Sequence, residues 1–374
     1  MKCIELKELN QLFIHLKKKG YGLVGPVVKD GAIVFGEIDS PGDLPAGWTD
    51  SQEKGRYRLI PRSDRALFGY SVGPQSLKKF LFPPVLKLWT AKKSGKTIRI
   101  KPQNHDTNAL AIFGVRSCDL HALFIQDKVF LGREQQGSHE DPYYRAQRDR
   151  LFIIAVNCTQ AGKTCFCHSM GTGPAVSKGY DLLMTEVLNE EKHEFILEAG
   201  SQRGEEALER LPGRPGGDIE KLAVEEIIRK TISEMKRTVD TAGIQALFYE
   251  NQEHPRWEAT AERCLACGNC TMVCPTCFCS TVEDSLDLSG SESNRMRKWD
   301  SCFSPDFSYI HGGAVRGTIR AKYRQWLTHK MAGWIEQFGT SGCVGCGRCI
   351  TWCPPGIDLT EEVKALKEKG LSLP

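Results

Sequence analysis

The pattern of apolar and polar positions predicts alternating helices and strands at the start of the chain. Apolar residues recur at helical spacing over residues 5–18, and they alternate over residues 22–37 around an Asp-Gly turn. Residues 40–66 are rich in Pro, Gly, Asp and Ser, which predicts loops. We expect a short helix, interrupted by a Pro-Pro pair, over residues 75–89.

Two short apolar runs predict the core of a parallel sheet. Residues 110–115 and 151–156 read as buried strands, and a helix-like segment over residues 120–129 separates them. A strand, a helix and a strand within about 50 residues are typical of a βαβ unit. Residues 181–198 alternate as a further hairpin. These elements predict an α/β fold for the N-terminal domain.

The second half of the chain reads as mostly helical. An amphipathic helix is expected within residues 221–250, a long helix over residues 317–338 and a short charged helix over residues 360–369. We therefore expect an α/β N-terminal domain and a mostly α-helical, ferredoxin-type C-terminal domain with two clusters. The expected division is residues 1–200, a connection and helical lead-in over residues 201–250, and residues 251–374.

One cysteine motif occurs twice in that C-terminal domain. It reads Cys-x2-Cys-x2-Cys-x3-Cys-Pro at residues 264–275 and again at residues 343–354. This run binds [4Fe–4S] cubes in bacterial ferredoxins, where three closely spaced thiolates hold one cube and the fourth reaches the other. Paired Cys-x2-Cys is also a zinc spacing, but the repetition with its following proline favours two iron–sulfur clusters.

The ferredoxin pattern assigns four thiolates to each cluster. The first set is Cys264, Cys267, Cys270 and Cys353. The second set is Cys343, Cys346, Cys349 and Cys274. The neighbouring residues Asn269 and Arg348 are candidates for tuning cluster potentials. The thiolates are expected to be ligands, and no catalytic residue is assigned.

Four more cysteines follow the two predicted parallel strands. Ligands of open parallel sheets bind beyond the carboxyl ends of the strands, so we expect these thiols to be candidates for a third [4Fe–4S] cluster. Zinc binding and simple burial of the thiols remain open alternatives. The four residues are Cys118, Cys158, Cys165 and Cys167.

Four cysteines remain after these assignments, and one of them, Cys3 near the N-terminus, is left unassigned. Cys277, Cys279 and Cys302 either pack structurally or make sulfur contacts that tune a cluster. Basic and aromatic residues also share the helix predicted over residues 317–338. They are expected to form a solvated face with core aromatics, and a docking surface for a redox partner is the alternative.

The composition bears on the cellular compartment of the protein and on the partners it can have. The chain has 374 residues, sixteen cysteines and a formal net charge of +4, and we expect no nucleic-acid partner. No run approaches the roughly 18 apolar residues of a membrane span. The N-terminus is charged and amphipathic, unlike a signal peptide, so disulfides are not expected. These features predict a cytoplasmic protein with reduced thiols.

With these residues in view, the chain resembles the iron–sulfur beta subunit of cytoplasmic sulfhydrogenases. It is similar also to the A subunit of anaerobic sulfite reductases and to subunits of flavin oxidoreductase–heterodisulfide reductase complexes. The resemblance extends over nearly the whole chain. It is carried by residues 113–120, 165–167 with 170–173, 264–279, 299–303 and 343–354.

The resemblance implies a relay subunit of an oxidoreductase complex from anaerobic metabolism. It implies a flavin-containing partner that oxidises NAD(P)H and a terminal hydrogenase, sulfite reductase or heterodisulfide reductase subunit. Whether the chain is itself an enzyme stays open. One alternative is a catalytic reductase subunit that acts on a small substrate at the N-terminal cluster or at a flavin. Another is a zinc-stapled assembly scaffold.

Overall fold

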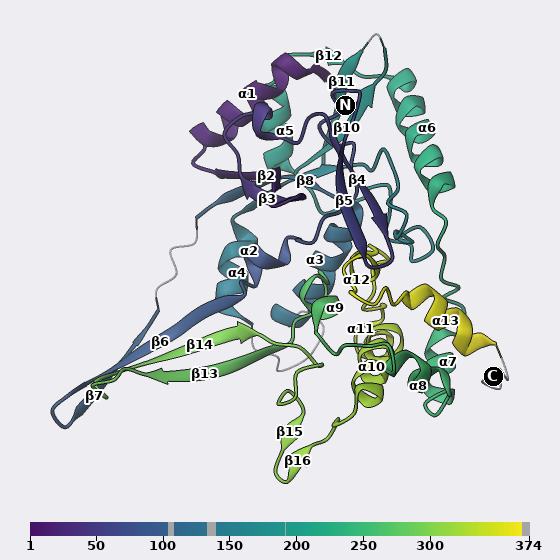
Figure 1. Cartoon of the computed structure of the whole chain (residues 1–374). Coiled ribbons are helices and arrows are strands. Elements are labelled where there is room, and N and C mark those ends of the chain that lie inside the picture. The colour runs from purple at the N-terminus through teal and green to yellow at the C-terminus, as the bar shows by residue number, and fades with distance from the viewer. Residues whose placement is uncertain (104–107, 133–139, 191, 369–374) are drawn as a thin grey trace.

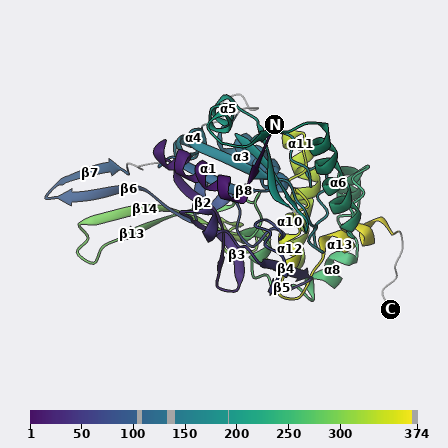
Figure 2. The ribbon, with the colours of Figure 1, turned by 90° about the horizontal axis from the view of Figure 1, so that it is seen from above.

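The computed structural model describes residues 1–103, 108–132, 140–190 and 192–368. A large mixed sheet with its helices forms one half of the body, and a region of short helices forms the other (Figure 1). A narrow four-stranded sheet extends away from the body in both ribbon views (Figures 1 and 2). Within the described ranges, no helix is long and apolar enough to cross a membrane.

The main sheet is built around two parallel strands. β8 (Leu110–Val115) and β9 (Leu151–Val156) pair in parallel, as predicted, with α3 (Ser117–Phe130) and α4 (Pro142–Asp149) between them in the chain. The strand order is β12-β1-β11-β10-β9-β8-β2-β3. The other strands are β12 (Arg214–Pro215), β1 (Lys2–Glu5), β11 (His193–Ala199), β10 (Leu182–Leu188), β2 (Gly22–Lys29) and β3 (Ala32–Glu37).

Helices cover both faces of this sheet, which explains why its central strands are apolar throughout. On one face lie α1 (Leu6–Lys18) and α5 (Gln202–Glu209), and Phe13 stacks on Phe113 with 4.4 Å between ring centroids. On the other face α3 and α4 pack against Ile112, which points the opposite way from Phe113.

The extended sheet, here called the arm, joins two distant parts of the chain. Its order is β13-β14-β6-β7, and β14 pairs antiparallel with β6. Two small hairpins, β4–β5 and β15–β16, lie elsewhere. The bounds are β6 (Val85–Ser94), β7 (Thr97–Pro102), β13 (Ser280–Leu286), β14 (Glu292–Trp299), β4 (Trp48–Glu53), β5 (Arg56–Pro61), β15 (Tyr309–Ile310) and β16 (Gly313–Ala314).

The cysteine motifs lie among short helices that pack around a second core, in which Trp257, Tyr323 and Trp326 are buried. The helix expected over residues 317–338 is present as α10, a π-helical turn η2 and α11. These are α10 (Ile319–Thr328), η2 (His329–Gly333) and α11 (Trp334–Phe338). The remaining helices are η1 (Pro41–Asp43), α2 (Lys78–Leu81), α6 (Asp218–Glu234), α7 (Ile244–Glu250), α8 (Arg256–Ala261), α9 (Asn269–Met272), α12 (Arg348–Thr351) and α13 (Leu359–Lys367).

Several expectations need correction. The helix predicted over residues 75–89 is limited to α2, because Pro83 and Pro84 stop it and the β-branched Val85 starts β6. The segment read as loops contains the hairpin β4–β5, which turns at Gly55 with φ 67°. The mostly helical character of residues 251–374 is not confirmed, because β13 to β16 lie between the two motifs.

Candidate metal centres

The two ferredoxin-type motifs fold into loops with the same backbone path. The third and fifth residues of each loop are left-handed: Ala266 (φ 49°) and Gly268 (φ 74°) in the first, Gly345 (φ 62°) and Gly347 (φ 76°) in the second. As a result, the backbone N–H groups of Ala266 and Gly345 each donate to the first Sγ of their motif at 3.4 Å. Such donors stabilise a thiolate.

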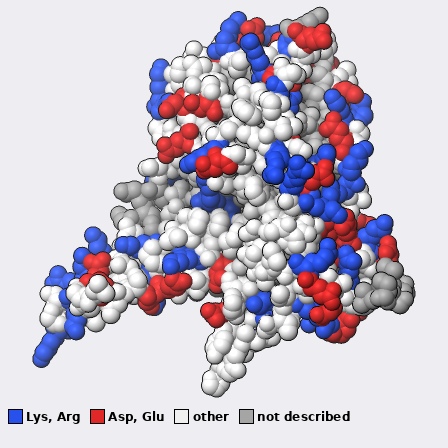
Figure 3. Space-filling model, viewed as in Figure 1, with Lys and Arg blue, Asp and Glu red and all other residues white. Residues whose placement is uncertain are grey.

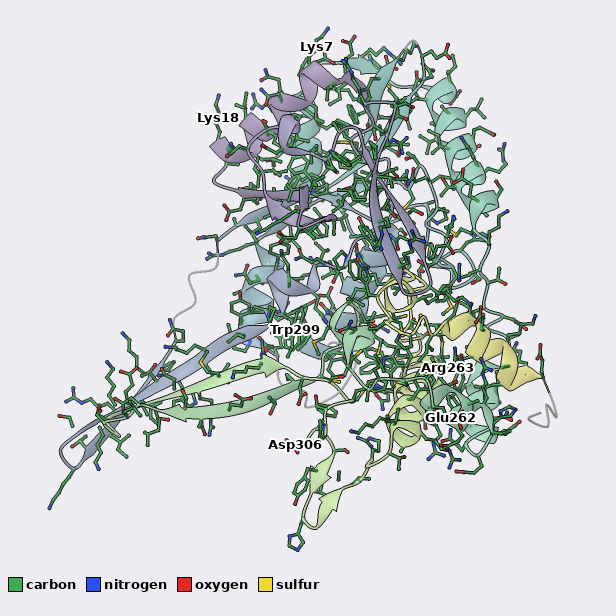
Figure 4. All side chains as sticks on the ribbon, viewed as in Figure 1. Lys7, Lys18, Glu262, Arg263, Trp299 and Asp306 are labelled. Atoms are coloured by element: carbon green, nitrogen blue, oxygen red, sulfur yellow. The ribbon has the colours of Figure 1, made fainter. Side chains whose placement is uncertain are left out.

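The first three thiols of the first motif line one cavity together with the last cysteine of the second motif. Tyr323 and Trp326 contribute to its wall, and the exposed Cys267 brings the cavity to the surface. Arg263, which is labelled in Figure 4, lies directly before this loop. It pairs with Glu362 of α13 at 3.1 Å. The structure thus brings together the first predicted set: Cys264, Cys267, Cys270 and Cys353.

The first three thiols of the second motif gather around Cys274, deeper in the molecule. Burial raises the pKa of Cys349 well above its usual value, and the charges of Cys343, Cys346 and Cys274 raise it further. These four are the second predicted set, so they lie within electrostatic range of one another. Cys349 also lines the cavity of the first set. The two predicted sets are therefore neighbours.

The four N-terminal cysteines also converge. Cys118 lies in the first turn of α3, directly after β8, and Cys158 lies two residues beyond the end of β9. Burial, followed by the charges of Cys158 and Cys346, raises the pKa of Cys165 to about 12. Burial, followed by the charges of Cys165 and Cys158, raises the pKa of Cys167. The candidate third site is thus assembled beside the second motif.

The N-terminal cysteine loop touches the second motif through backbone atoms. Phe166 donates its N–H to the carbonyl oxygen of Gly345 at 2.8 Å. A Cβ on Gly345 would meet the Cα of Cys167 at 2.7 Å, and one on Gly347 would meet the carbonyl oxygen of Thr164 at 2.5 Å. Glycine is therefore required here for close approach as well as for its positive φ.

A buried ion pair links the same two regions. Arg348 of α12 pairs with Asp119, the residue after Cys118, at 2.8 Å, and the two side chains are 1% and 2% exposed. The guanidinium also donates to the carbonyl oxygens of Gly73 and Gln75 at 2.8 and 3.0 Å. The pairing neutralises two charges that burial would otherwise make unfavourable. Asp119 was not anticipated from the sequence, although it adjoins a candidate ligand.

Lys330 was read from the sequence as part of a solvated basic face, and that reading is wrong. The residue is 5% exposed because the π-helical turn carries it inward. Its Nζ donates to Cys274 Sγ at 3.2 Å and to Thr276 Oγ1 at 3.0 Å. Burial opposes its charge, but the thiols of Cys274 and Cys277 hold the pKa of Lys330 above its usual value.

Three of the four unassigned thiols, Cys277, Cys279 and Cys302, lie next to this lysine. Cys277 is hydrogen-bonded to Cys274, and this bond, opposed by burial, lowers the pKa of Cys274 well below its usual value. Cys279 is hydrogen-bonded to Cys302, which lowers the pKa of Cys279 to about 7. All three line a cavity of about 330 Å³ with Lys330. Their positions fit sulfur contacts around the second set.

The cysteine arrangement also bears on the zinc alternative. Among the described residues, no group of three or more His, Cys, Asp and Glu side chains is arranged to hold a single metal ion. An iron–sulfur cube sets a different requirement, because each thiolate binds a separate iron atom. All sixteen cysteines are free of disulfides. Each set offers the four separate thiolates that such a cube requires.

Comparison with known proteins shows which proteins this chain is similar to. A family model described as a 4Fe-4S dicluster domain matches residues 263–357, which include both motifs. Sulfhydrogenase 2 subunit beta of Pyrococcus furiosus is 30% identical over 366 residues, which cover 96% of this chain and 95% of that protein. The chain belongs to the sulfhydrogenase beta-subunit family. No solved structure matches it.

Membership in this family applies to more of the chain than the dicluster match covers. The family model ends at residue 357 and begins at residue 263, so it leaves the N-terminal cysteines outside. The relative matches almost the whole chain, including the α/β half that carries those cysteines. Family membership therefore applies to the molecule as a unit, while the ligand sets rest on the geometry described above.

Proposed function

We propose that this member of the sulfhydrogenase beta-subunit family carries electrons, one at a time, between two other subunits of an oxidoreductase complex. One observation supports this most directly: the cysteines form a continuous series from the interior to the surface. The N-terminal thiols adjoin Cys346, Cys349 lines the first-set cavity, and Cys267 of that set is exposed. A relay requires such a series, whereas a structural metal site does not.

The proposed cofactors are three [4Fe–4S] clusters. The two ferredoxin-type sets would each hold one, and Cys118, Cys158, Cys165 and Cys167 would hold the third. Such clusters take up and release single electrons, which is the chemistry the chain itself lacks. The protein buries or partly buries the thiols of the second and third sets, and it supplies the charges and N–H donors around them.

The residues around the second set favour retention of negative charge there. Lys330 lies 3.2 Å from Cys274 Sγ, and Gly345 donates its N–H to Cys343 Sγ at 3.4 Å. Positive charge and hydrogen bonds to sulfur both stabilise a more reduced, more negative site. We infer that the second set has the higher potential of the two ferredoxin-type sites. Lys330 contacts Cys274 directly, whereas backbone N–H groups donate to the first set, from Ala266 to Cys264 Sγ at 3.4 Å and from Ile357 to Cys353 Sγ at 3.3 Å.

The proposed partners are a flavin-containing NAD(P)H oxidoreductase subunit and a terminal subunit. A hydrogenase is favoured at the terminal position, because the relative is named a sulfhydrogenase subunit; a sulfite or heterodisulfide reductase is the alternative. We propose a cytoplasmic location, which agrees with sixteen free thiols. We also propose that the chain divides at residues 200 and 250. The arm then contains strands from both the first and the last of these segments.

The alternative of a catalytic reductase at the N-terminal cysteines has less support. Cys118 and Cys167 are buried, and Gly345 and Gly347 hold the second motif against their loop at backbone contact. A substrate would need an open approach to this site. A stoichiometric flavin absorbance in the purified chain would favour the catalytic alternative.

A redox titration monitored by electron paramagnetic resonance tests the relay. The anaerobically purified chain is titrated stepwise with dithionite. Neighbouring clusters are expected to give broadened spectra with spin–spin interaction as the second site becomes reduced. Signals from fully isolated clusters, or a colourless protein that contains zinc, would contradict the relay proposal.

A further inference from the structure

The arm has one apolar and one polar face. Directly paired residues share a face, because side chains alternate along each strand. One row across all four strands is Ile100, Ala91, Ser293 and Leu286. The next row, on the opposite face, is Lys101, Thr90, Asn294 and Ser285. The same face carries Trp89, Ile98 and Val282, together with Lys93 and the Asp284–Arg295 ion pair.

The apolar face is left exposed by the chain. Ile98, Ile100 and Leu286 are 66%, 64% and 69% exposed, and Val282 is 53% exposed. An antiparallel sheet with this alternation ordinarily buries its apolar face against a core. Both ribbon views show the arm reaching away from the body (Figures 1 and 2). A contiguous exposed apolar surface of this kind marks a protein interface.

The charge of the arm indicates which kind of surface covers this face. Residues 85–102 contain six Lys or Arg residues and no Asp or Glu, and basic side chains crowd the free end of the arm (Figure 3). The acidic residues of β13 and β14 already have partners, such as Asp284 with Arg295 at 2.6 Å and Glu292 with Lys92 at 3.0 Å. The edge formed by β7 therefore keeps an excess of positive charge.

This charge argues against a second copy of the chain as the occupant. Residues 85–102 and 280–299 together contain nine Lys or Arg and four Asp or Glu residues. Two arms that packed through their apolar faces would therefore bring two net positive surfaces together, and like charges at an interface disfavour association. Lysines on an edge strand also oppose the addition of a further strand. The occupant must therefore offer an apolar surface with carboxylates beside it.

We propose that the apolar face of the arm is the docking surface for a different subunit of the complex, whose matching surface is apolar and flanked by Asp and Glu side chains. The proposal rests on the proposed function, since it requires a complex. It assigns a role to β6, β7, β13 and β14, which hold none of the proposed cluster ligands. The apolar contact supplies affinity, and the basic edge selects an acidic partner.

Carbodiimide cross-linking tests this on the native complex, purified anaerobically with a tag on this chain. The reagent joins amines to carboxylates at zero length, so mass spectrometry reports which carboxylates lie beside Lys93 on the apolar face and Lys96 at the turn between β6 and β7. We expect links to Asp or Glu of another subunit. Links only to a second copy, or only within this chain, would overturn the docking proposal.

A matched pair of double variants tests the apolar face itself. Ile98→Glu with Leu286→Glu places two charges on this face, and Thr97→Glu with Ser285→Glu places the same two charges on the opposite face of the same strands. We expect the first pair to reduce recovery of the cross-linked subunit by about tenfold or more, with iron content and melting temperature unchanged. The second pair should retain the subunit. Equal behaviour of both pairs would overturn the proposal.

The same preparation distinguishes failure of the docking proposal from failure of the proposed function. A complex that contains other subunits but gives no links from the arm overturns only the docking surface. A chain that is isolated from its own cells without any other subunit overturns membership in a complex and docking together. Iron content is unaffected by either outcome, so the assignment of the clusters stands or falls separately.

Discussion

The loop of the first motif and the loop of the second share a cysteine spacing and a backbone path, yet their surroundings differ. In the first loop Asn269 is exposed and donates to the carbonyl oxygen of Trp352 at 3.3 Å. The corresponding residue of the second loop, Arg348, is buried and paired with Asp119. Ala266 in the first loop is replaced by Gly345 in the second, where a Cβ would strike Cys167.

This difference shows that spacing and environment specify different things. The spacing and the left-handed residues position thiolates and N–H donors in the same way in both loops. The environment decides whether the site faces solvent or the N-terminal domain. We infer that the second loop is the junction between the two halves of the molecule, while the first is the site of exchange with a partner. Substitutions at equivalent positions should therefore have unequal effects.

Substitution of Arg348 is expected to have the largest effect on the free energy of unfolding. Arg348→Met leaves Asp119 buried without its partner, and removal of one member of a buried pair lowers the free energy of unfolding by about 3–5 kcal/mol. Asn269→Met at the equivalent exposed position should change it by no more than about 0.5 kcal/mol. Anaerobic denaturant titration of both variants gives the comparison. Similar losses in the two would contradict a buried junction at the second loop.

Substitutions at the third residue of each loop should have smaller effects on stability than Arg348→Met. The two substitutions should have effects of opposite sign. Gly345→Ala introduces a methyl group 2.7 Å from the Cα of Cys167, and we expect a loss of about 1–3 kcal/mol. Ala266→Gly removes a left-handed non-glycine residue, so it should be neutral or stabilising by up to about 1 kcal/mol. Thermal melts under anaerobic conditions measure both changes. Destabilisation by Ala266→Gly of the size seen for Gly345→Ala would remove the asymmetry.

The smallest structural change, Lys330→Met, should act on potential more than on assembly. Loss of the cation beside Cys274 disfavours the more negative, reduced state, so the midpoint potential of the second-set cluster should fall. Lys330→Arg keeps the charge and should retain most of the wild-type potential. A redox titration by electron paramagnetic resonance measures both variants at equal iron content. An unchanged potential in Lys330→Met would show that this charge does not distinguish the two sites.

The sequence predicted what depends on local pattern. Cysteine spacing identified both motifs, and apolar periodicity located β8, β9 and the helix that begins at α10. The convergence of Cys118 and Cys158 followed from a rule for parallel sheets, because both residues come directly after neighbouring strands. These inferences needed no knowledge of distant contacts.

The features that the sequence did not reveal depend on long-range pairing. Residues 85–94 were read partly as helix because their strand partner, β14, lies about two hundred residues later in the chain. Lys330 looked like one of several surface cations, and only the π-helical turn shows that it points inward. Asp119 could be recognised as a partner only once Arg348 was placed beside it.

The central claim is that three groups of thiols each hold a cube, with the second motif between the other two. Iron, acid-labile sulfide and zinc per chain, measured on anaerobically purified protein, test it most directly. Three cubes require about twelve iron and about twelve sulfide per chain, and Cys165→Ser should lower both while both ferredoxin-type clusters remain. About eight of each in the wild-type protein, unchanged in Cys165→Ser, would contradict the third site, and zinc without iron or sulfide would contradict all three.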